Sequence, residues 1–269
     1  MNPAVSIILP TFNRAMSLER SVESVLNQTF TNFEIIIVDD GSVDQTPSVI
    51  ESLLKKDPRI KAIRFENNLG PAAARNSGIR EASGEYVAFQ DSDDVWNEKK
   101  LEKQCLLLKN LPPDYGFVFS TYQRISGKKS MVLPRRLLNT NTDDLFIRIL
   151  TKNLVGTPTA IIRKSCIDQS GLMDESLMAL EDWEFFIRLS RKFKAKFFKE
   201  PLVKVYTDQH NRLSTSGLKL LKARKKILSI HLSEITKKPL ILTRHCMKIF
   251  MLSLYVFITK LLNRSFFLI

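Results

Sequence analysis

Short apolar runs with strand character alternate with segments of helical spacing through the first third of the chain. The runs lie at residues 5–9, 35–38, 61–65 and 85–89, and the helical segments at 17–27, 44–56 and 71–82. This alternation predicts an α/β fold with a Rossmann-like, mostly parallel central sheet covered by helices on both faces. In such sheets, ligands bind at the carboxyl ends of the strands.

Polar residues follow three of these runs. Because the carboxyl ends of neighbouring parallel strands meet at one edge of a sheet, we expect the three segments to form one site. They are Pro10-Thr11-Phe12-Asn13-Arg14, Asp39-Asp40-Gly41-Ser42 and Asp91-Ser92-Asp93-Asp94.

The last of these segments holds three carboxylates within four residues, and these repel one another unless water or a cation screens them. Mg²⁺ and Mn²⁺ prefer oxygen ligands, and Mg²⁺ usually takes only one or two protein carboxylates together with substrate phosphates and water. The cluster therefore indicates a metal-diphosphate site. Because Asp is also frequent at turns and helix caps, the alternative is a solvated acidic turn before a helix that begins near Asn97.

Two further positions suit a nucleotide. A carboxylate of Asp39 or Asp40 accepts hydrogen bonds from a nucleobase N–H or a ribose hydroxyl, although these residues equally suit a turn around Gly41. Arg75 lies on a predicted helix rich in small residues, which allows close approach to the sheet edge and offers a guanidinium to a base or phosphate. The alternative for Arg75 is a structural ion pair with an aspartate.

The second half of the chain carries weaker strand signals and one clear helix. Strands are expected at 116–122, 159–163, 195–198 and 202–206, and two basic amphipathic helices from about Gly217 onward, separated near Pro239. The clear helix is Glu181–Lys192, and its predicted core residues are Trp183, Phe186, Ile187 and Leu189.

The net charge of +13 is concentrated in the last part of the chain. Residues 1–187 hold 22 basic and 25 acidic side chains, whereas residues 188–269 hold 19 basic and 3 acidic ones. Such a segment attracts polyanions, namely nucleic acid, anionic lipid or an acidic acceptor. The three cysteines are widely spaced and no basic region precedes the first apolar run, so we expect a reducing, cytoplasmic location without a secretory signal.

The order and spacing of four segments resemble the N-terminal half of family 2 glycosyltransferases. The segments are 5–14, 37–42, Asn68-Leu69-Gly70 with 74–78, and 91–94, and the resemblance covers about residues 4–210, most strongly 4–104. It implies the GT-A fold, a nucleotide-diphosphate sugar as donor, a divalent metal (Mn²⁺ or Mg²⁺) and inversion at the anomeric carbon.

The resemblance also implies roles for individual residues of the donor site. The nucleoside and donor-binding residues are Pro10, Thr11, Asn13, Arg14, Asp39, Asp40, Arg75, Asp91 and Ser92, with Asp91 near the ribose. Asp93 and Asp94 are the candidate metal ligands, and which carboxylate of the cluster binds the ion is left open.

Residues 179–184 resemble the family's Glu-Asp motif, which opens a helix beside the acceptor. An inverting transfer needs a base that removes the acceptor hydroxyl proton, and the resemblance assigns this role to Asp182. Glu181 and Trp183 are expected among the substrate- or nucleotide-binding residues, with Trp183 stacking on an acceptor sugar. From the sequence alone, Glu181 and Asp182 are also ordinary acidic residues of a first helical turn.

Residues 206–214 occupy the place of a Tyr-Arg-x-His-like segment that closes over the diphosphate in the family. Thr207 stands where the family has Arg, which puts this closure in question. His210 is the candidate metal or phosphate ligand, with a structural role as the alternative, and Arg212 is a candidate for the missing positive charge.

The apolar stretch 249–259 lies between Lys248 and Lys260. Its eleven residues are fewer than the roughly 20 needed to cross a bilayer, so an interfacial helix is expected. The basic cluster at 219–226 would attract anionic lipid. The alternative is that this helix packs on the catalytic domain or on a second subunit.

The sequence therefore predicts a GT-A domain at 1–215, with a nucleotide-binding half (1–110) and an acceptor half (111–215), and a basic helical tail at 216–269. The expected function is inverting, metal-assisted transfer of a hexose or N-acetylhexosamine, with UDP as the expected carrier, to a glycan or lipid-linked glycan. The expected setting is polysaccharide or lipopolysaccharide synthesis at the inner face of the cell membrane.

Two other functions are alternatives to a glycosyltransferase. One is a catalytically silent sugar-nucleotide-binding protein. The other is a nucleic-acid binder, which the strand-end carboxylates disfavour because they repel a polyanion.

Overall fold

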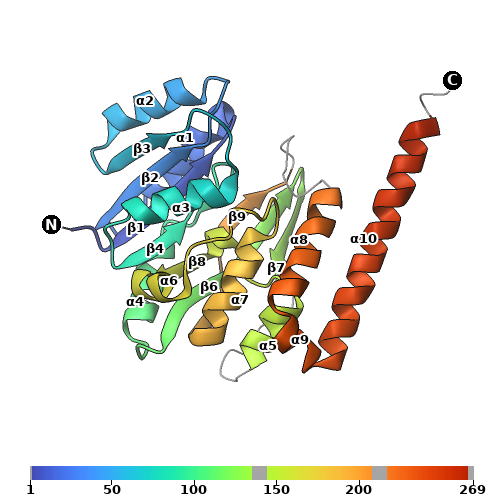
Figure 1. Cartoon of the computed structure of the whole chain (residues 1–269). Coiled ribbons are helices and arrows are strands. Elements are labelled where there is room, and N and C mark those ends of the chain that lie inside the picture. Colours follow the sequence, from blue (N-terminus) through green and yellow to red (C-terminus); the bar gives the residue numbers. More distant parts are fainter. Residues whose placement is uncertain (1, 135–143, 208–216, 266–269) are drawn as a thin grey trace.

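The computed structural model describes residues 2–134, 144–207 and 217–265 (Figure 1). In this part of the chain the strands form one sheet in the order β3-β2-β1-β4-β8-β6-β9-β5, with β7 paired to β6. The strands are β1 (Val5–Thr11), β2 (Phe33–Asp39), β3 (Ile60–Arg64), β4 (Tyr86–Phe89), β5 (Val95–Trp96), β6 (Tyr115–Ser126), β7 (Lys129–Leu133), β8 (Ala160–Arg163) and β9 (Lys194–Tyr206).

The first four strands are parallel, as the sequence predicts. β1 pairs with β2 and with β4, and β2 pairs with β3, so the carboxyl ends of β1, β2 and β4 meet at one edge. The second half of the sheet is mixed, because β8 runs antiparallel to both β4 and β6 while β9 runs parallel to β6. Parallel pairing therefore extends through the whole first half of the sheet, whereas the second half combines parallel and antiparallel pairs.

The two strands expected at 195–198 and 202–206 form one strand, β9. Pro201 lacks the N–H that a regular ladder requires. The register against β6 shifts beside the Thr121–Pro201 pair, so the irregularity accommodates the proline without ending the strand.

Successive residues of the central strands face opposite sides of the sheet, and each side has its own apolar core. Ile7 and Ile35 belong to one core, and their neighbours Ile8 and Ile36 belong to the other. The first core is covered by α1 (Ala15–Leu26), α2 (Thr46–Lys56) and α4 (Lys100–Lys109). The second is covered by α3 (Pro71–Glu81), α5 (Asp144–Thr151), α6 (Lys164–Ser170), α7 (Glu181–Lys192), α8 (Gly217–Ile230), α9 (Leu232–Thr236) and α10 (Pro239–Ser265). A short 3₁₀ helix, Thr157–Thr159, precedes β8.

Small residues bring α3 against β1. Ala72, Ala74 and Gly78 are buried, and a Cβ added at Gly78 would lie 2.5 Å from Ile8 Cγ2 and 3.3 Å from Ile8 Cβ. Because Ile8 is fully buried and its own Cβ is in the way, no rotamer change relieves this contact. The close packing positions Arg75, on the same helix, at the carboxyl edge of the sheet.

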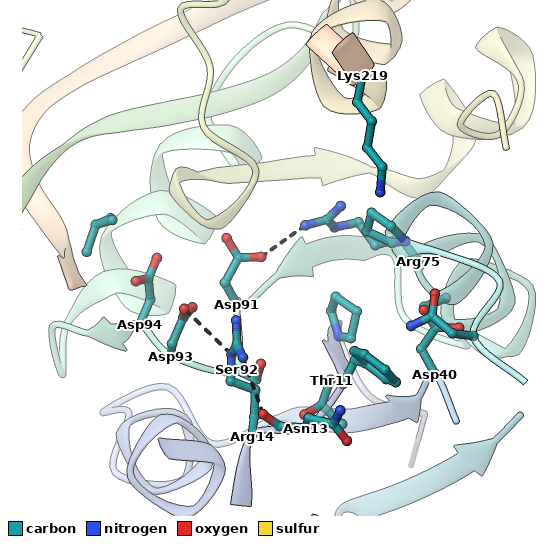
Figure 2. Close-up of a pocket in the computed structure, with 16 residues that line it drawn as sticks. Thr11, Asn13, Arg14, Asp40, Arg75, Asp91, Ser92, Asp93, Asp94 and Lys219 are labelled. Carbon is teal, nitrogen blue, oxygen red and sulfur yellow. Dashed lines mark hydrogen bonds and ion pairs between the residues drawn. The ribbon is translucent and has the colours of Figure 1, made fainter. Parts of the chain in front are cut away.

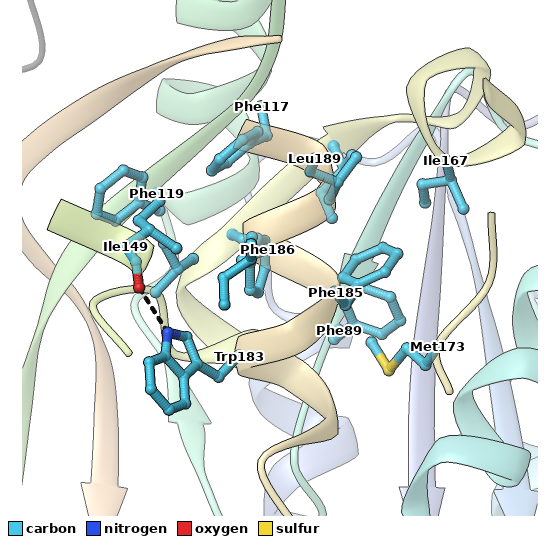
Figure 3. Packing of buried hydrophobic residues seen from close by; sticks show 14 of the residues in the cluster. Phe89, Phe117, Phe119, Ile149, Ile167, Met173, Trp183, Phe185, Phe186 and Leu189 are labelled. Atoms are coloured by element: carbon cyan, nitrogen blue, oxygen red, sulfur yellow. Dashed lines mark hydrogen bonds between the residues drawn. The ribbon is translucent and has the colours of Figure 1, made fainter. Parts of the chain in front are cut away.

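Helix α7 fills the second core with aromatic rings (Figure 3). The predicted core residues Trp183, Phe186, Ile187 and Leu189 are all fully buried. The Trp183 indole donates a hydrogen bond to the Ile149 carbonyl (2.6 Å) and stacks on His245, with ring centroids 5.7 Å apart. The expected stacking of Trp183 on an acceptor sugar is therefore wrong in this structure, because the ring is covered by protein.

The basic tail packs on the domain in its first part. Ala223, Ile227, Ile235 and Ile241 belong to the same core as α7, and α10 runs alongside α8 (Figure 1). Farther along α10, large apolar side chains are exposed. The packing alternative therefore holds for the start of α10, and the interfacial helix stays a prediction that the exposed later stripe leaves open to test. The predicted boundary at residues 215 and 216 lies outside the described residues.

The segment Pro239–Thr259 is long and apolar enough, by length and composition, to cross a membrane. The eleven-residue count at 249–259 underestimated its length, because the helix continues through Arg244 and Lys248. Length alone therefore does not decide between a helix that lies on a membrane and one that crosses it.

Replacing Gly78 with Ala is expected to lower the free energy of unfolding by about 1–3 kcal/mol, although Ala is the better helix former. The added methyl has no space beside Ile8. Urea unfolding measures the change, with Ser77→Ala on the same helix as the control. A Gly78→Ala variant as stable as the wild type would contradict the close approach of α3 and β1.

Candidate functional site

A cavity of about 610 Å³ opens where the loops after β1, β2 and β4 meet (Figure 2). It lies at the sheet edge where the three polar segments were expected to converge. Its lining residues are Pro10, Thr11, Phe12, Asn13, Arg14, Asp40, Asn68, Pro71, Ala74, Arg75, Asp91, Ser92, Asp93, Asp94, Val205 and Lys219.

Asn13 joins the loops after β1 and β2. Its backbone N–H donates to Ser42 Oγ (2.9 Å), and its side-chain oxygen accepts from the Val43 N–H (2.9 Å). Asn13 has a left-handed φ of 52°, which Asn adopts more readily than most residues. The asparagine of this motif therefore shapes the cavity wall through its own backbone conformation.

Asp40 anchors the segment that leads into α3. Its carboxylate accepts the backbone N–H groups of Leu69 (2.7 Å) and Gly70 (2.9 Å). Burial raises the pKa of Asp40 against the effect of these two hydrogen bonds. The adjacent Gly41 has a φ of 76°, and a Cβ there would lie 2.9 Å from the Asn67 carbonyl carbon. Asp40 and Gly41 therefore contact the segment at residues 67–70, which leads into the helix that bears Arg75.

Asp39 is buried and is not among the residues that line the cavity. Its Oδ1 accepts the Ser42 N–H (3.0 Å), and Arg64 Nε lies 3.5 Å from Oδ2. Within the described part of the chain, Oδ2 accepts no hydrogen bond, and the buried hydroxyl of Thr11 has no partner either. Buried hydroxyls without a partner are rare, so Thr11 is suited to form a hydrogen bond with a ligand, whereas Asp39 Oδ2 already forms an ion pair with Arg64.

Arg75 is the charged centre of the site. Only 7% of the residue is exposed, and its guanidinium pairs with Asp91 Oδ1 (3.0 Å) and Glu181 Oε1 (2.9 Å). Asp91 lies on the loop after β4, whereas Glu181 begins α7. Arg75 therefore joins the nucleotide-binding half to the start of the predicted acceptor helix. It forms the structural ion pair with an aspartate that was the alternative interpretation, and it also lines the cavity as predicted.

Asp182 follows Glu181 at the start of α7 and is half-buried. Its carboxylate accepts hydrogen bonds from the Trp183 N–H (2.7 Å) and the Asn153 amide (3.0 Å). Burial and then the Glu181 carboxylate raise the pKa of Asp182 from 3.8 to about 6, while Asn153 and the Arg75 cation oppose the rise. A carboxyl with this pKa is ionised at neutral pH and is still basic enough to accept a proton.

The three carboxylates of the acidic loop coexist because each has a different neighbour. Asp91 pairs with Arg75, Asp93 Oδ2 lies 3.8 Å from Arg14 Nε, and the buried Asp94 accepts the Tyr206 N–H (3.3 Å). Figure 2 shows the contacts of Asp91 with Arg75 and of Asp93 with Arg14. Cations of the protein therefore face two of the three carboxylates, and a backbone N–H faces the third.

The described residues do not gather three His, Cys, Asp or Glu side chains as a metal cage. The donor set nevertheless fits Mg²⁺ or Mn²⁺, because Asp93 supplies a hard oxygen at the cavity and such ions complete their shell with substrate phosphates. The predicted ligand His210, and Arg212 with it, lie outside the described residues.

Phe12 and Lys219 are two of the lining residues to which sequence reasoning gave no site role. Phe12 is 39% exposed and lines the cavity, which its place in the motif could have indicated. Lys219 comes from α8 and points toward Arg75 (Figure 2). No local signal marks Lys219, because it reaches the cavity only through the packing of the tail.

Comparisons with known proteins show the family to which the chain belongs. The family described as glycosyl transferase family 2 matches residues 6–169, and the chain belongs to this family. An uncharacterized glycosyltransferase of Rickettsia bellii is 36% identical over 190 residues, which are 70% of this chain and 26% of the relative.

A second relative has a described reaction. It is the UDP-Glc:alpha-D-GlcNAc-diphosphoundecaprenol beta-1,3-glucosyltransferase WfgD of Escherichia coli, 38% identical over 137 residues, which are 49% of this chain and 52% of the relative. The chain therefore spans less than two thirds of the length of either relative.

Solved structures share the fold. S. aureus TarS 1–349 in complex with UDP-GlcNAc has a TM-score of 0.68 at 22% identity, covering 84% of this chain and 65% of that one. A mannosyltransferase of Pyrobaculum calidifontis in complex with GDP-Man and Mn²⁺ has a TM-score of 0.63 at 18% identity, covering 85% and 65%. The expected GT-A fold is confirmed.

Proposed function

We propose that the protein is an inverting glycosyltransferase that moves a hexose or N-acetylhexosamine from a UDP-sugar to a lipid-linked glycan of the cell surface. The proposal rests on one observation, namely that Arg75 ties the cavity to the helix start that bears Asp182. The described reaction of the Escherichia coli relative and the UDP-GlcNAc bound by TarS support the choice of donor and acceptor.

The donor is proposed to lie with its nucleoside at the β1 and β2 loops and its diphosphate near the acidic loop. Thr11 offers a buried hydroxyl that has no partner among the described residues, Asp39 offers a carboxylate that pairs with Arg64, and Phe12 lines the cavity. Arg14, Arg75 and Lys219 supply positive charge around the cavity. A divalent ion held by Asp93 and the diphosphate, with Asp94 as the second candidate ligand, would offset the charge of the leaving group.

Asp182 is proposed to act as the base. The acceptor hydroxyl oxygen attacks the anomeric carbon while Asp182 takes the hydroxyl proton, and the bond from that carbon to the diphosphate oxygen breaks. Attack from the side opposite the leaving group inverts the anomeric centre. Arg75 and Asn153 favour the ionised carboxylate that this step requires.

We further propose that the tail at 216–269 holds the 1–215 domain at the anionic inner face of the membrane. Met247, Phe250, Leu254 and Phe257 lie at helical spacing on α10 and are between 43% and 65% exposed. The lysines of α8 favour anionic lipid. No nucleic-acid partner is proposed, and association of a second copy through this stripe is the competing outcome of the membrane test.

Transfer is expected to rise with pH and to reach half its maximum near pH 6, because Asp182 must be ionised. Asp182→Asn is expected to slow transfer by about 10²–10⁴-fold. UDP release would be followed across pH with the UDP-sugar that most stabilises the protein in a thermal-shift screen. Asp168→Asn, on an exposed side chain, is the control. Full activity of Asp182→Asn with UDP-sugar still bound would exclude this base, and binding without turnover in the wild type would favour a silent sensor.

Asp93→Ala is expected to weaken UDP binding about tenfold in the presence of Mn²⁺ and to leave binding without metal unchanged. The carboxylate is needed only when an ion bridges it to the diphosphate. Calorimetric titration of UDP with and without Mn²⁺ measures both values, with Asp114→Asn as the control. The metal proposal fails if Mn²⁺ strengthens UDP binding equally in the variant and the wild type.

Replacing Phe250, Leu254 and Phe257 together with Gln is expected to release the protein from phosphatidylglycerol vesicles in a flotation assay. Leu106→Gln on α4, which removes an equally exposed apolar side chain, is the control and should keep binding. If the wild type fails to float and its apparent mass shows a dimer that the triple variant loses, the stripe is a contact between copies instead.

A further inference from the structure

A second pocket lies between the tail and the start of α7. Its volume is about 380 Å³, and it is lined by Leu180, Leu220, Arg224, Lys248, Met251 and Leu252. These residues come from α8, from α10 and from the position just before Glu181. None of them belongs to the cavity already described, and the sequence motifs give no role to this place.

Arg224 brings a positive charge to this pocket that the protein does not neutralise. Its guanidinium carbon lies 4.7 Å above the Trp183 ring, and its buried Nη1 has no hydrogen-bond partner in the described part of the chain. Burial lowers the pKa of Arg224. An arginine nevertheless stays protonated in proteins, and a buried charge is costly without a partner.

Arg224 forms a group with three further cations, Lys248, Lys152 and Arg244. The pKa of Lys248 is lowered by burial and then by the nearby charges of Arg224, Lys152 and Arg244. None of these four cations forms an ion pair with a carboxylate among the residues that the structure describes. The pocket therefore has an unbalanced positive potential, and an anion of two or more charges complements it.

The remaining walls are apolar. Leu180, Leu220, Met251 and Leu252 complete the lining, and the exposed Phe250 and Leu254 continue along α10. Inorganic phosphate or a nucleotide would leave these walls without a partner. A molecule with a charged diphosphate and an apolar chain matches both the cations and the walls.

The pocket is also next to the proposed base. Leu180 directly precedes Glu181 and Asp182, and it has a left-handed φ of 61° that turns the chain into α7. Helix α8 reaches both sites, since Lys219 lines the first cavity while Leu220 and Arg224 line the second pocket. A sugar attached to a diphosphate in the second pocket would be close to Asp182.

We propose that this pocket binds the diphosphate and the first part of the lipid chain of a lipid-linked acceptor, through Arg224 and Lys248. The proposal rests on the proposed function, because it defines the acceptor class of that reaction. It makes Arg224 and Lys248 binding residues for the acceptor, and it gives the tail a role in substrate choice besides membrane attachment.

The test is calorimetric titration with farnesyl diphosphate, farnesol and inorganic pyrophosphate, beside titration with UDP and Mn²⁺. Farnesyl diphosphate is expected to bind, and Arg224→Gln and Lys248→Gln are each expected to weaken it about tenfold or more. Lys225→Gln, on an exposed position of the same helix, is the matched control and should bind as the wild type does. UDP binding should be the same in all four proteins.

Because Arg224 packs on Trp183, circular dichroism is used to detect a folding defect in its variant. Lys248, which lies on α10, then provides the decisive variant. Equal affinity for farnesyl diphosphate in Lys248→Gln and Lys225→Gln would overturn the proposal. So would equal affinity for pyrophosphate, which would indicate a phosphate site, or displacement of farnesyl diphosphate by UDP. If farnesyl diphosphate binds as expected while UDP does not bind the wild type, the proposed function fails and the lipid site stands.

Discussion

The buried ion pairs of Arg75 are the interaction on which the rest of the site depends. A guanidinium with 7% exposure is stable only if its charge is balanced, and Asp91 and Glu181 provide that balance from two distant segments. The packing of α3 places Arg75 where it reaches both carboxylates. Gly78 lets α3 approach β1, and Asp40 fixes the turn that leads into the helix. The sheet edge and the start of α7 are thereby held as one unit.

The Arg75 guanidinium also acts on the neighbouring carboxylates of the site. Glu181 and burial raise the pKa of Asp182, whereas Arg75 limits the rise. The carboxylates of the acidic loop are separated in a similar way, since Asp93 lies toward Arg14 and Asp94 accepts the Tyr206 N–H. Charges of one sign can therefore be concentrated where a diphosphate and a metal ion are proposed to meet.

The sequence predicted the first half of the fold well because local signals and tertiary packing agree there. The strand runs near residues 7 and 36 and the helices between them appear at the expected places, and their loops converge on the cavity. Trp183 shows the limit of this reasoning. An aromatic residue after an acidic pair has the same spacing whether its ring faces a ligand or the core, and here the tail helices cover it through His245 and Arg224. Lys219 and the second pocket arise from the same tail packing, which no local pattern encodes.

The central claim is that Arg75 limits the rise in the pKa of Asp182 while it joins the start of α7, through Glu181, to the donor cavity. The most direct measurement is the pH dependence of single-turnover sugar transfer by Arg75→Gln beside the wild type, at saturating donor. The loss of the cation should move the lower limb of the profile to a pH above the wild-type value near 6. A variant that turns over with an unchanged limb would show that Arg75 does not act on the base.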